Sequence, residues 1–217
     1  MDQDDYLPRK GDSLFKLNPT GDMNADLAFL KGDKYGFVVA KAFKASGDAI
    51  IQRFQDTHEW YKDPELFMPA MYCYRHYIEM ILKWNLQCGG AWKLTSVTEA
   101  ELTKEHSLHR LWNGAKPVIQ TLWSSLNPET LDSVQRLILD MHTIDETGQN
   151  MRYAADKHDN HTLAKVPDVV SLDHLQEMAL KLYRFFEKLE DEWQRWMGQQ
   201  EWEDGHVEML IDERLGK

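Results

Sequence analysis

The stretch from Asp63 to Gln87, DPELFMPAMYCYRHYIEMILKWNLQ, carries the strongest helix signal in the chain. Its start is typical of a helix, because aspartate caps free N–H groups, Pro64 fits the first helical position and Glu65 suits the first turn. Apolar residues then recur at helical spacing, at Met71, Tyr74, Ile78, Ile81 and Leu82. We expect Pro69 to bend this helix or delay its start, and the CGG run at 88–90 to end it.

Four other segments have helical patterns. Residues 33–55 place six apolar residues at helical spacing around Gly47, which costs about 1 kcal/mol relative to alanine. A loop with alternating Thr and Glu precedes residues 105–126, which predict a helix interrupted near Gly114 and Pro117. Residues 127–144 begin with a capping Asn127 and Pro128. Residues 171–197 form a long amphipathic pattern capped by Ser171.

The pattern as a whole predicts an all-α fold, because strand signals are few and no repeat is present. We expect a four-to-five-helix bundle over residues 33–200. Residues 1–32 contain three glycines and two prolines and should form an irregular N-terminal arm. Residues 201–217 should form an acidic C-terminal tail with a short helix.

Composition narrows the function classes. The 217 residues are enough for one domain with a substantial core, and 42% are hydrophobic. No segment has the length and apolarity of a signal peptide or a membrane span, so we expect a cytoplasmic protein without membrane contact. Cys73 and Cys88 should be free thiols. A net charge of −11 argues against indiscriminate nucleic-acid binding but leaves room for a small basic cleft.

The stretch Asn150–His161, NMRYAADKHDNH, lies in the predicted loop over residues 145–170. Arg152 can hold a phosphodiester with two parallel N–H donors. His158 can take a proton from a ribose hydroxyl or give one to a leaving oxygen. Together they suffice to cut RNA without a metal or other cofactor. Arginine and histidine at this spacing also occur by chance, so a solvated or structurally paired set remains the alternative.

Three features resemble the HEPN family, a set of small four-helix proteins that includes many ribonucleases. Arg152 and His158 fit the family's R-x(4–6)-H motif. The segment YRHYIEMILKWNL resembles its second helix, with Arg75 and Glu79 one turn apart. EHSLHRLW resembles the opening of a later helix. The likeness covers roughly residues 35 to 196, although Tyr153 stands where active members often have a polar residue.

The resemblance implies a homodimer in which two copies of the motif face each other across a cleft. Arg152 would bind the scissile phosphate and His158 would act as general acid or base, leaving a 2′,3′-cyclic phosphate. Such a ribonuclease would be a toxin or antiviral defence effector, with an antitoxin or another protein as a further partner. Glu79 would hold Arg152 by an ion pair, and His161 would assist or remain a surface residue.

The alternative is a non-catalytic dimeric scaffold or protein-interaction module of the same fold. Between Asp145 and Asp168 three basic residues face five acidic ones, which suits a polyanion poorly unless Lys104, Arg110 and Lys116 add charge. For Arg75 and Glu79 the alternatives are an i,i+4 pair or a role in orienting the motif loop.

Metal chemistry is not indicated. His106 and His109 lie three residues apart, but a zinc site needs two further ligands, and neither C-x-x-C nor H-E-x-x-H occurs. We therefore expect these histidines to pack at a helix start.

Overall fold

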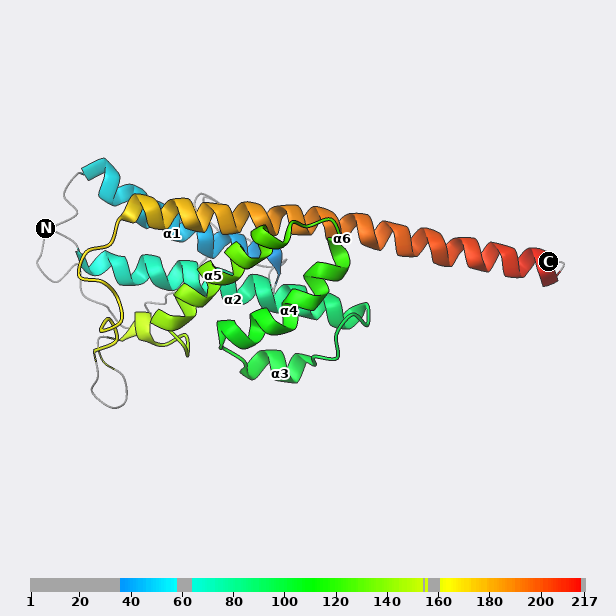
Figure 1. Ribbon diagram of the computed structural model, residues 1–217, viewed down its shortest axis with the longest axis horizontal. Coiled ribbons are helices and arrows are strands. Elements are labelled where there is room, and N and C mark those ends of the chain that lie inside the picture. Colours follow the sequence, from blue (N-terminus) through cyan, green and yellow to red (C-terminus); the bar gives the residue numbers. More distant parts are fainter. Residues whose placement is uncertain (1–35, 58–63, 154, 156–160, 216–217) are drawn as a thin grey trace, which may run out of the picture. The chain divides into compact units, whose positions relative to one another are not determined.

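The computed structural model describes residues 36–57, 64–153, 155 and 161–215, with side chains as far as residue 200. The chain divides into two units, Met1–Lys34 and Tyr35–Lys217, and all described residues belong to the second. These described residues form six α-helices and two short 3-10 helices, in the order α1 (Phe37–Thr57), η3 (Pro64–Leu66), α2 (Phe67–Ala91), α3 (Glu99–Lys104), α4 (Leu108–Leu122), α5 (Pro128–Ile144), η4 (Asn150–Arg152) and α6 (Leu172–Leu215) (Figure 1).

The predicted all-α bundle is confirmed for this part of the chain, in which two isolated bridge residues, Ala155 and His161, provide the only β-type pairing. The expected irregular arm over residues 1–32 lies outside the described residues. None of the described helices combines the length and apolarity needed to cross a bilayer.

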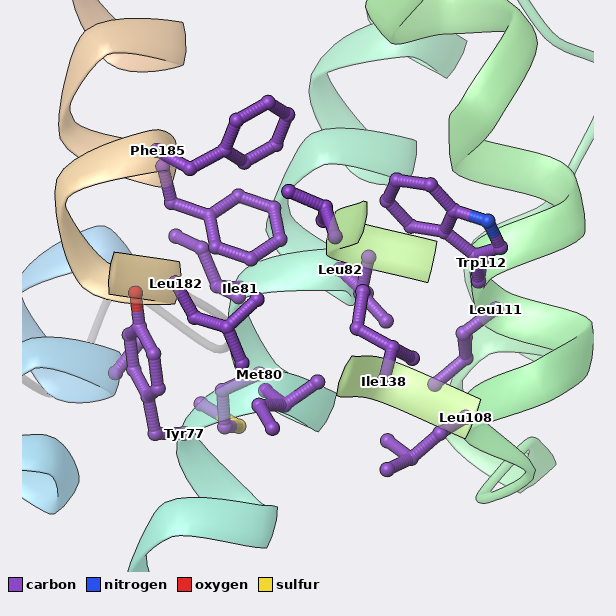
Figure 2. Close-up of a cluster of buried hydrophobic side chains, with 14 of the residues drawn as sticks. Tyr77, Met80, Ile81, Leu82, Leu108, Leu111, Trp112, Ile138, Leu182 and Phe185 are labelled. Carbon is purple, nitrogen blue, oxygen red and sulfur yellow. The ribbon is translucent and has the colours of Figure 1, made fainter. Parts of the chain in front are cut away.

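Helix α2 is the centre of the bundle and packs against both α1 and α4. Figure 2 shows its residues Tyr77, Met80, Ile81 and Leu82 meeting side chains from three other helices. These partners are Leu108, Leu111 and Trp112 of α4, Ile138 of α5, and Leu182 and Phe185 of α6. Because α2 is surrounded in this way, even its polar residues Arg75, Glu79, Lys83 and Asn85 are buried.

Two of the predicted helix starts are confirmed in detail. The Asn127 side chain accepts the Glu129 N–H at 2.8 Å, and Ser171 Oγ accepts the His174 N–H at 3.2 Å. At α2 the start is later than predicted: Phe67 is its first residue, and Leu66 precedes it without a side-chain cap. Pro69 is thus the third residue of the helix, a position whose N–H has no intrahelical partner.

One predicted helix end, one predicted loop and one predicted helix interruption differ from the structure. Helix α2 continues through the glycines at 89–90 to Ala91, and the chain turns at Lys93, which has φ +59°. The Thr/Glu segment contains α3, whose start is closed by reciprocal hydrogen bonds between Thr98 and Glu101. Helix α4 runs unbroken through Gly114 and Pro117.

Helix α6 is one helix of 44 residues. The tail expected over residues 201–217 continues its backbone as far as Leu215 instead of forming a separate helix. Gly198 does not break it, which agrees with the modest helix penalty of a single glycine.

Gly47 in α1 is required by packing. A Cβ at this position would lie 2.7 Å from Cε1 of Tyr74, a buried residue whose hydroxyl donates to Asp48 at 2.9 Å. Gly47→Ala should therefore lower the free energy of unfolding by about 1–2 kcal/mol, since the steric cost exceeds the gain in helix propensity. Urea titration of both variants measures this effect. Gly198→Ala is the control: a Cβ at this position would meet no atom within 4 Å, so the variant should be as stable as wild type or more stable. Equal stabilisation by both variants would contradict this account.

Candidate functional site

Arg152 is the last residue of η4 and its side chain is exposed. The guanidinium carbon lies 5.9 Å from the centre of the Tyr72 ring on α2, within the range of a cation–π contact. No carboxylate in the described part of the chain pairs with it. The guanidinium thus lies against an aromatic ring, and no carboxylate of the described residues occupies its N–H donors.

His158 lies outside the described residues, but the segments on either side of it meet. Ala155 and His161 form an isolated antiparallel bridge. The Thr162 hydroxyl donates to the carbonyl oxygen of Tyr153 at 2.5 Å. The two ends of the segment that contains His158 are therefore held together next to Arg152. His161 itself is exposed.

The loop before Arg152 is folded around one buried carboxylate. Asp145 ends α5, and its Oδ1 accepts the backbone N–H groups of Gly148, Gln149 and Asn150 at 2.8, 3.0 and 3.2 Å. The Asn150 side chain donates to the carbonyl oxygen of Ile144 at 2.9 Å. These bonds satisfy the backbone N–H groups of a tight turn without regular structure. They therefore fix the position of η4, of which Arg152 is the last residue.

Arg75 ties this loop to the core. Its side chain is buried, and Nε donates to the carbonyl oxygen of Asp145 at 3.1 Å and lies 3.2 Å from the Asp145 carboxylate. Nη1 donates to Glu79 at 2.6 Å and Nη2 to the carbonyl oxygen of His106 at 2.6 Å. Both alternatives considered for Arg75 therefore apply. It forms the i,i+4 pair with Glu79, and it also binds the loop after α5 through Asp145.

Gly148 is needed where the loop passes this guanidinium. It has φ +78°, and a Cβ would lie 2.9 Å from Nη1 of Arg75. Both the backbone conformation and the close approach favour glycine.

Glu79 is occupied by partners other than Arg152. Its carboxylate contacts Arg75 at 2.6 Å, Lys83 at 2.8 Å and Nδ1 of His106 at 2.9 Å. The expected ion pair between Glu79 and Arg152 is not formed, because α2 supplies a nearer arginine one turn away. Burial alone would raise the pKa of Glu79, but the hydrogen bonds and charges of Lys83 and Arg75 outweigh it and lower this pKa to about 2.

The two histidines at the start of α4 have separate neighbours. His106 contacts Glu79, whereas His109 contacts Asn113 at 3.1 Å and lies 5.9 Å from His142 between ring centres. Within the described ranges no group of three or more His, Cys, Asp or Glu residues could hold a metal ion.

An aromatic cluster beside Arg152 was not foreseen from the sequence. Tyr72 and His76 lie one turn apart on α2 and stack with ring centres 5.5 Å apart and an interplanar angle of 9°. Phe43 of α1 meets the His76 ring edge-on at 4.3 Å. The signal was present as the Tyr72/His76 i,i+4 spacing, but only the fold shows that the arginine of the motif loop lies against it.

Most of the basic residues considered as additional cleft charges are engaged elsewhere. Arg110 pairs with Glu105 at 3.5 Å, and Lys116 pairs with Asp132 at 3.8 Å. Lys165 of the loop pairs with Glu146 at 2.7 Å. Among the described residues of the loop, Arg152 is therefore the cation that no described carboxylate pairs with.

Comparison with known proteins adds no further constraint. Neither the protein-family models nor the curated proteins and solved structures contain a match to this chain.

Proposed function

We propose that the protein is a HEPN-like, metal-independent endoribonuclease in which Arg152 binds the scissile phosphate and His158 transfers a proton. The observation that supports this function most is the exposed guanidinium of Arg152, which has no carboxylate partner among the described residues. A purely structural role in which Arg152 pairs with Glu79 is not supported, because Arg75, Lys83 and His106 occupy that carboxylate.

The rigid support of this arginine suits catalysis. A phosphate-binding residue contributes most when its position is fixed before substrate binds. Asp145 and Arg75 provide such support, because both are buried and together bind the loop backbone and α2. Arg152 would then neutralise the phosphate while the ribose 2′-oxygen attacks phosphorus and the bond to the 5′-oxygen breaks. The products would be a 2′,3′-cyclic phosphate and a 5′-hydroxyl.

The wider setting is part of the same proposal. The protein would act in the cytoplasm as a homodimer that brings two Arg152–His158 motifs to one cleft. RNA would be its substrate, and an antitoxin or another protein would restrain it as a toxin or defence effector.

A non-catalytic, dimeric interaction module is the second candidate. It is favoured by the exposed apolar surface of the loop, where Tyr153 is 58% and Val169 88% exposed. Exposed apolar side chains of this size suit contact with another protein. The excess of acidic residues around the motif points in the same direction.

RNA cleavage by pure protein in EDTA separates the two functions. Arg152→Ala and His158→Ala should each lower the rate by about 10²–10⁴-fold, because each removes charge stabilisation or proton transfer. Arg184→Ala and His174→Ala remove the same groups from exposed positions on α6 and should cleave like wild type. Equal residual activity in all five proteins would indicate a contaminating nuclease and would refute the enzyme.

A further inference from the structure

A cavity lies between α2, α5 and α6. Its volume is about 230 Å³, which exceeds the roughly 150 Å³ of an engineered apolar cavity that binds benzene. Protein interiors contain few voids of this size, because the atoms of the walls lose contacts across the gap. The cavity is thus large enough for one small organic molecule, whose atoms would supply the missing contacts.

The walls of this cavity are apolar and come from three helices. Each helix contributes one methionine, whose flexible and polarisable side chain can adapt to the shape of a bound group. Six buried or partly buried wall residues are Met71 and Ile78 of α2, Met141 and Ile144 of α5, and Met178 and Leu182 of α6. Walls of this kind suit the apolar part of a ligand, which is stabilised by removal of its surface from water.

The rim of the cavity is polar and carries one carboxylate. Asp140 of α5 and Ser171, just before α6, both line the cavity and are exposed. The side chain of Asp140 has no ion-pair or hydrogen-bond partner among the described residues. The lining contains no lysine or arginine, and histidine is ordinarily uncharged at pH 8. The rim therefore favours a ligand with a positive charge over one with a negative charge.

The cavity also touches both ends of the loop that carries Arg152. Ile144, the last residue of α5, lines the cavity, and its carbonyl oxygen accepts the Asn150 side chain at 2.9 Å. Val170 lines the cavity from the other end of the loop, two residues before α6 begins. A molecule in the cavity would therefore contact the residues from which the loop departs and to which it returns.

We propose that this cavity binds a small apolar molecule with a protonated amino group, and that its binding stabilises the loop that carries Arg152. The apolar part lies among the three methionines, and the ammonium group lies at the rim beside Asp140. Contact with Ile144 and Val170 restrains both ends of the loop. The proposal goes beyond the ribonuclease function and does not rest on it, because neither ligand binding nor loop stability involves RNA.

Isothermal titration calorimetry of the full-length protein at pH 8 tests the binding with two probes. 2-Phenylethylamine carries an ammonium group, and 3-phenylpropionate carries a carboxylate on the same phenylethyl body. The amine should bind with a dissociation constant on the order of 0.1 mM, and the carboxylate should bind about fivefold more weakly. Asp140→Asn should remove this preference. Asp132→Asn should keep it, because Asp132 is an exposed residue of the same helix outside the cavity lining.

A cavity-filling variant shows whether the ligand occupies this space. Ala179 is a buried residue of the cavity wall, so Ala179→Leu adds apolar atoms where the ligand would lie. This variant should bind 2-phenylethylamine at least about tenfold more weakly than wild type. Ala42→Leu makes the same change at an exposed position of α1 and should bind like wild type. Met178→Trp fills the cavity from a partly buried position and serves if Ala179→Leu does not fold.

Hydrogen exchange with and without saturating 2-phenylethylamine measures the effect on the loop. The amides of Gly148, Gln149 and Asn150, which Asp145 binds, should exchange at least about threefold more slowly in the complex. The same concentration of amine should leave their exchange unchanged in the cavity-filling variant.

Four results would overturn the proposal. Wild type that binds neither probe would mean that no such ligand enters, as expected if another segment of the chain or a second copy fills the cavity. Equal affinity of wild type for the two probes would refute the preference for an amine. Unchanged affinity in both Ala179→Leu and Met178→Trp would place the ligand elsewhere. Unchanged loop exchange in the complex would refute the effect on the loop. None of these results bears on RNA cleavage, which tests the ribonuclease separately.

Discussion

Replacing Arg75 by methionine should lower the free energy of unfolding by about 3–5 kcal/mol. Methionine has similar length, but it leaves Glu79 without its shortest ion pair and Asp145 without its cation. Both carboxylates are buried, so water cannot replace the lost partner. The loop carbonyl of Asp145 and the His106 carbonyl also lose their donors.

Urea unfolding measures this loss directly, and Arg110→Met is the matched control. Arg110 pairs with Glu105 at 3.5 Å from a side chain that is 77% exposed, and such a pair contributes about 0–1 kcal/mol. In native-state hydrogen exchange, Arg75→Met should also expose the amides of Gly148, Gln149 and Asn150, which Asp145 binds. Equal midpoints for Arg75→Met and Arg110→Met would show that the buried network does not stabilise the fold.

Acid should remove a comparable amount of stability through Glu79. Its pKa is lowered to about 2 in the folded protein from an ordinary value of 4.5. A lowered pKa stabilises the fold above the unfolded value, and this contribution is lost as the pH falls toward the folded value. Between about pH 5 and pH 2, the titration of this side chain should therefore cost about 3 kcal/mol.

Glu79→Gln isolates this contribution from that of the other carboxylates. Glutamine cannot ionise, so the variant should be less stable than wild type at pH 7, and the two unfolding curves should converge as the pH approaches 2. Urea titrations at several pH values measure the difference. A constant gap between wild type and Glu79→Gln over this range would mean that Glu79 is not held as a carboxylate by Arg75 and Lys83.

The helices could be predicted where sequence signals act locally. The apolar spacing of α2 and the caps at Asn127 and Ser171 depend on neighbours within one or two turns, and the structure confirms them. The ends were harder to predict because they depend on packing. At Gly89 a Cβ would lie 3.1 Å from Val118, so this glycine accommodates α4 instead of ending α2.

The sequence predicts which residues belong to the candidate site, but it does not predict which of them form ion pairs with one another. The sequence singles out Arg75, Glu79 and Arg152, yet which arginine meets Glu79 depends on the path of the loop after α5. That path is set by the Asp145 carboxylate, whose role as a loop anchor has no sequence signature beyond one aspartate at a helix end. The contact of Arg152 with Tyr72, and thereby the nearness of His76, likewise arises from tertiary structure.

The chemical ends of a cleaved RNA test the central claim most directly. The full-length protein is incubated with a defined single-stranded RNA in EDTA, and the fragments are identified by mass spectrometry. Attack by the neighbouring 2′-oxygen, with Arg152 on the phosphate, predicts fragments ending in a 2′,3′-cyclic phosphate and a 5′-hydroxyl, and a 2′-deoxy substitution should block cleavage at that position alone. Intact RNA, or fragments with a 3′-hydroxyl and a 5′-phosphate, would contradict it.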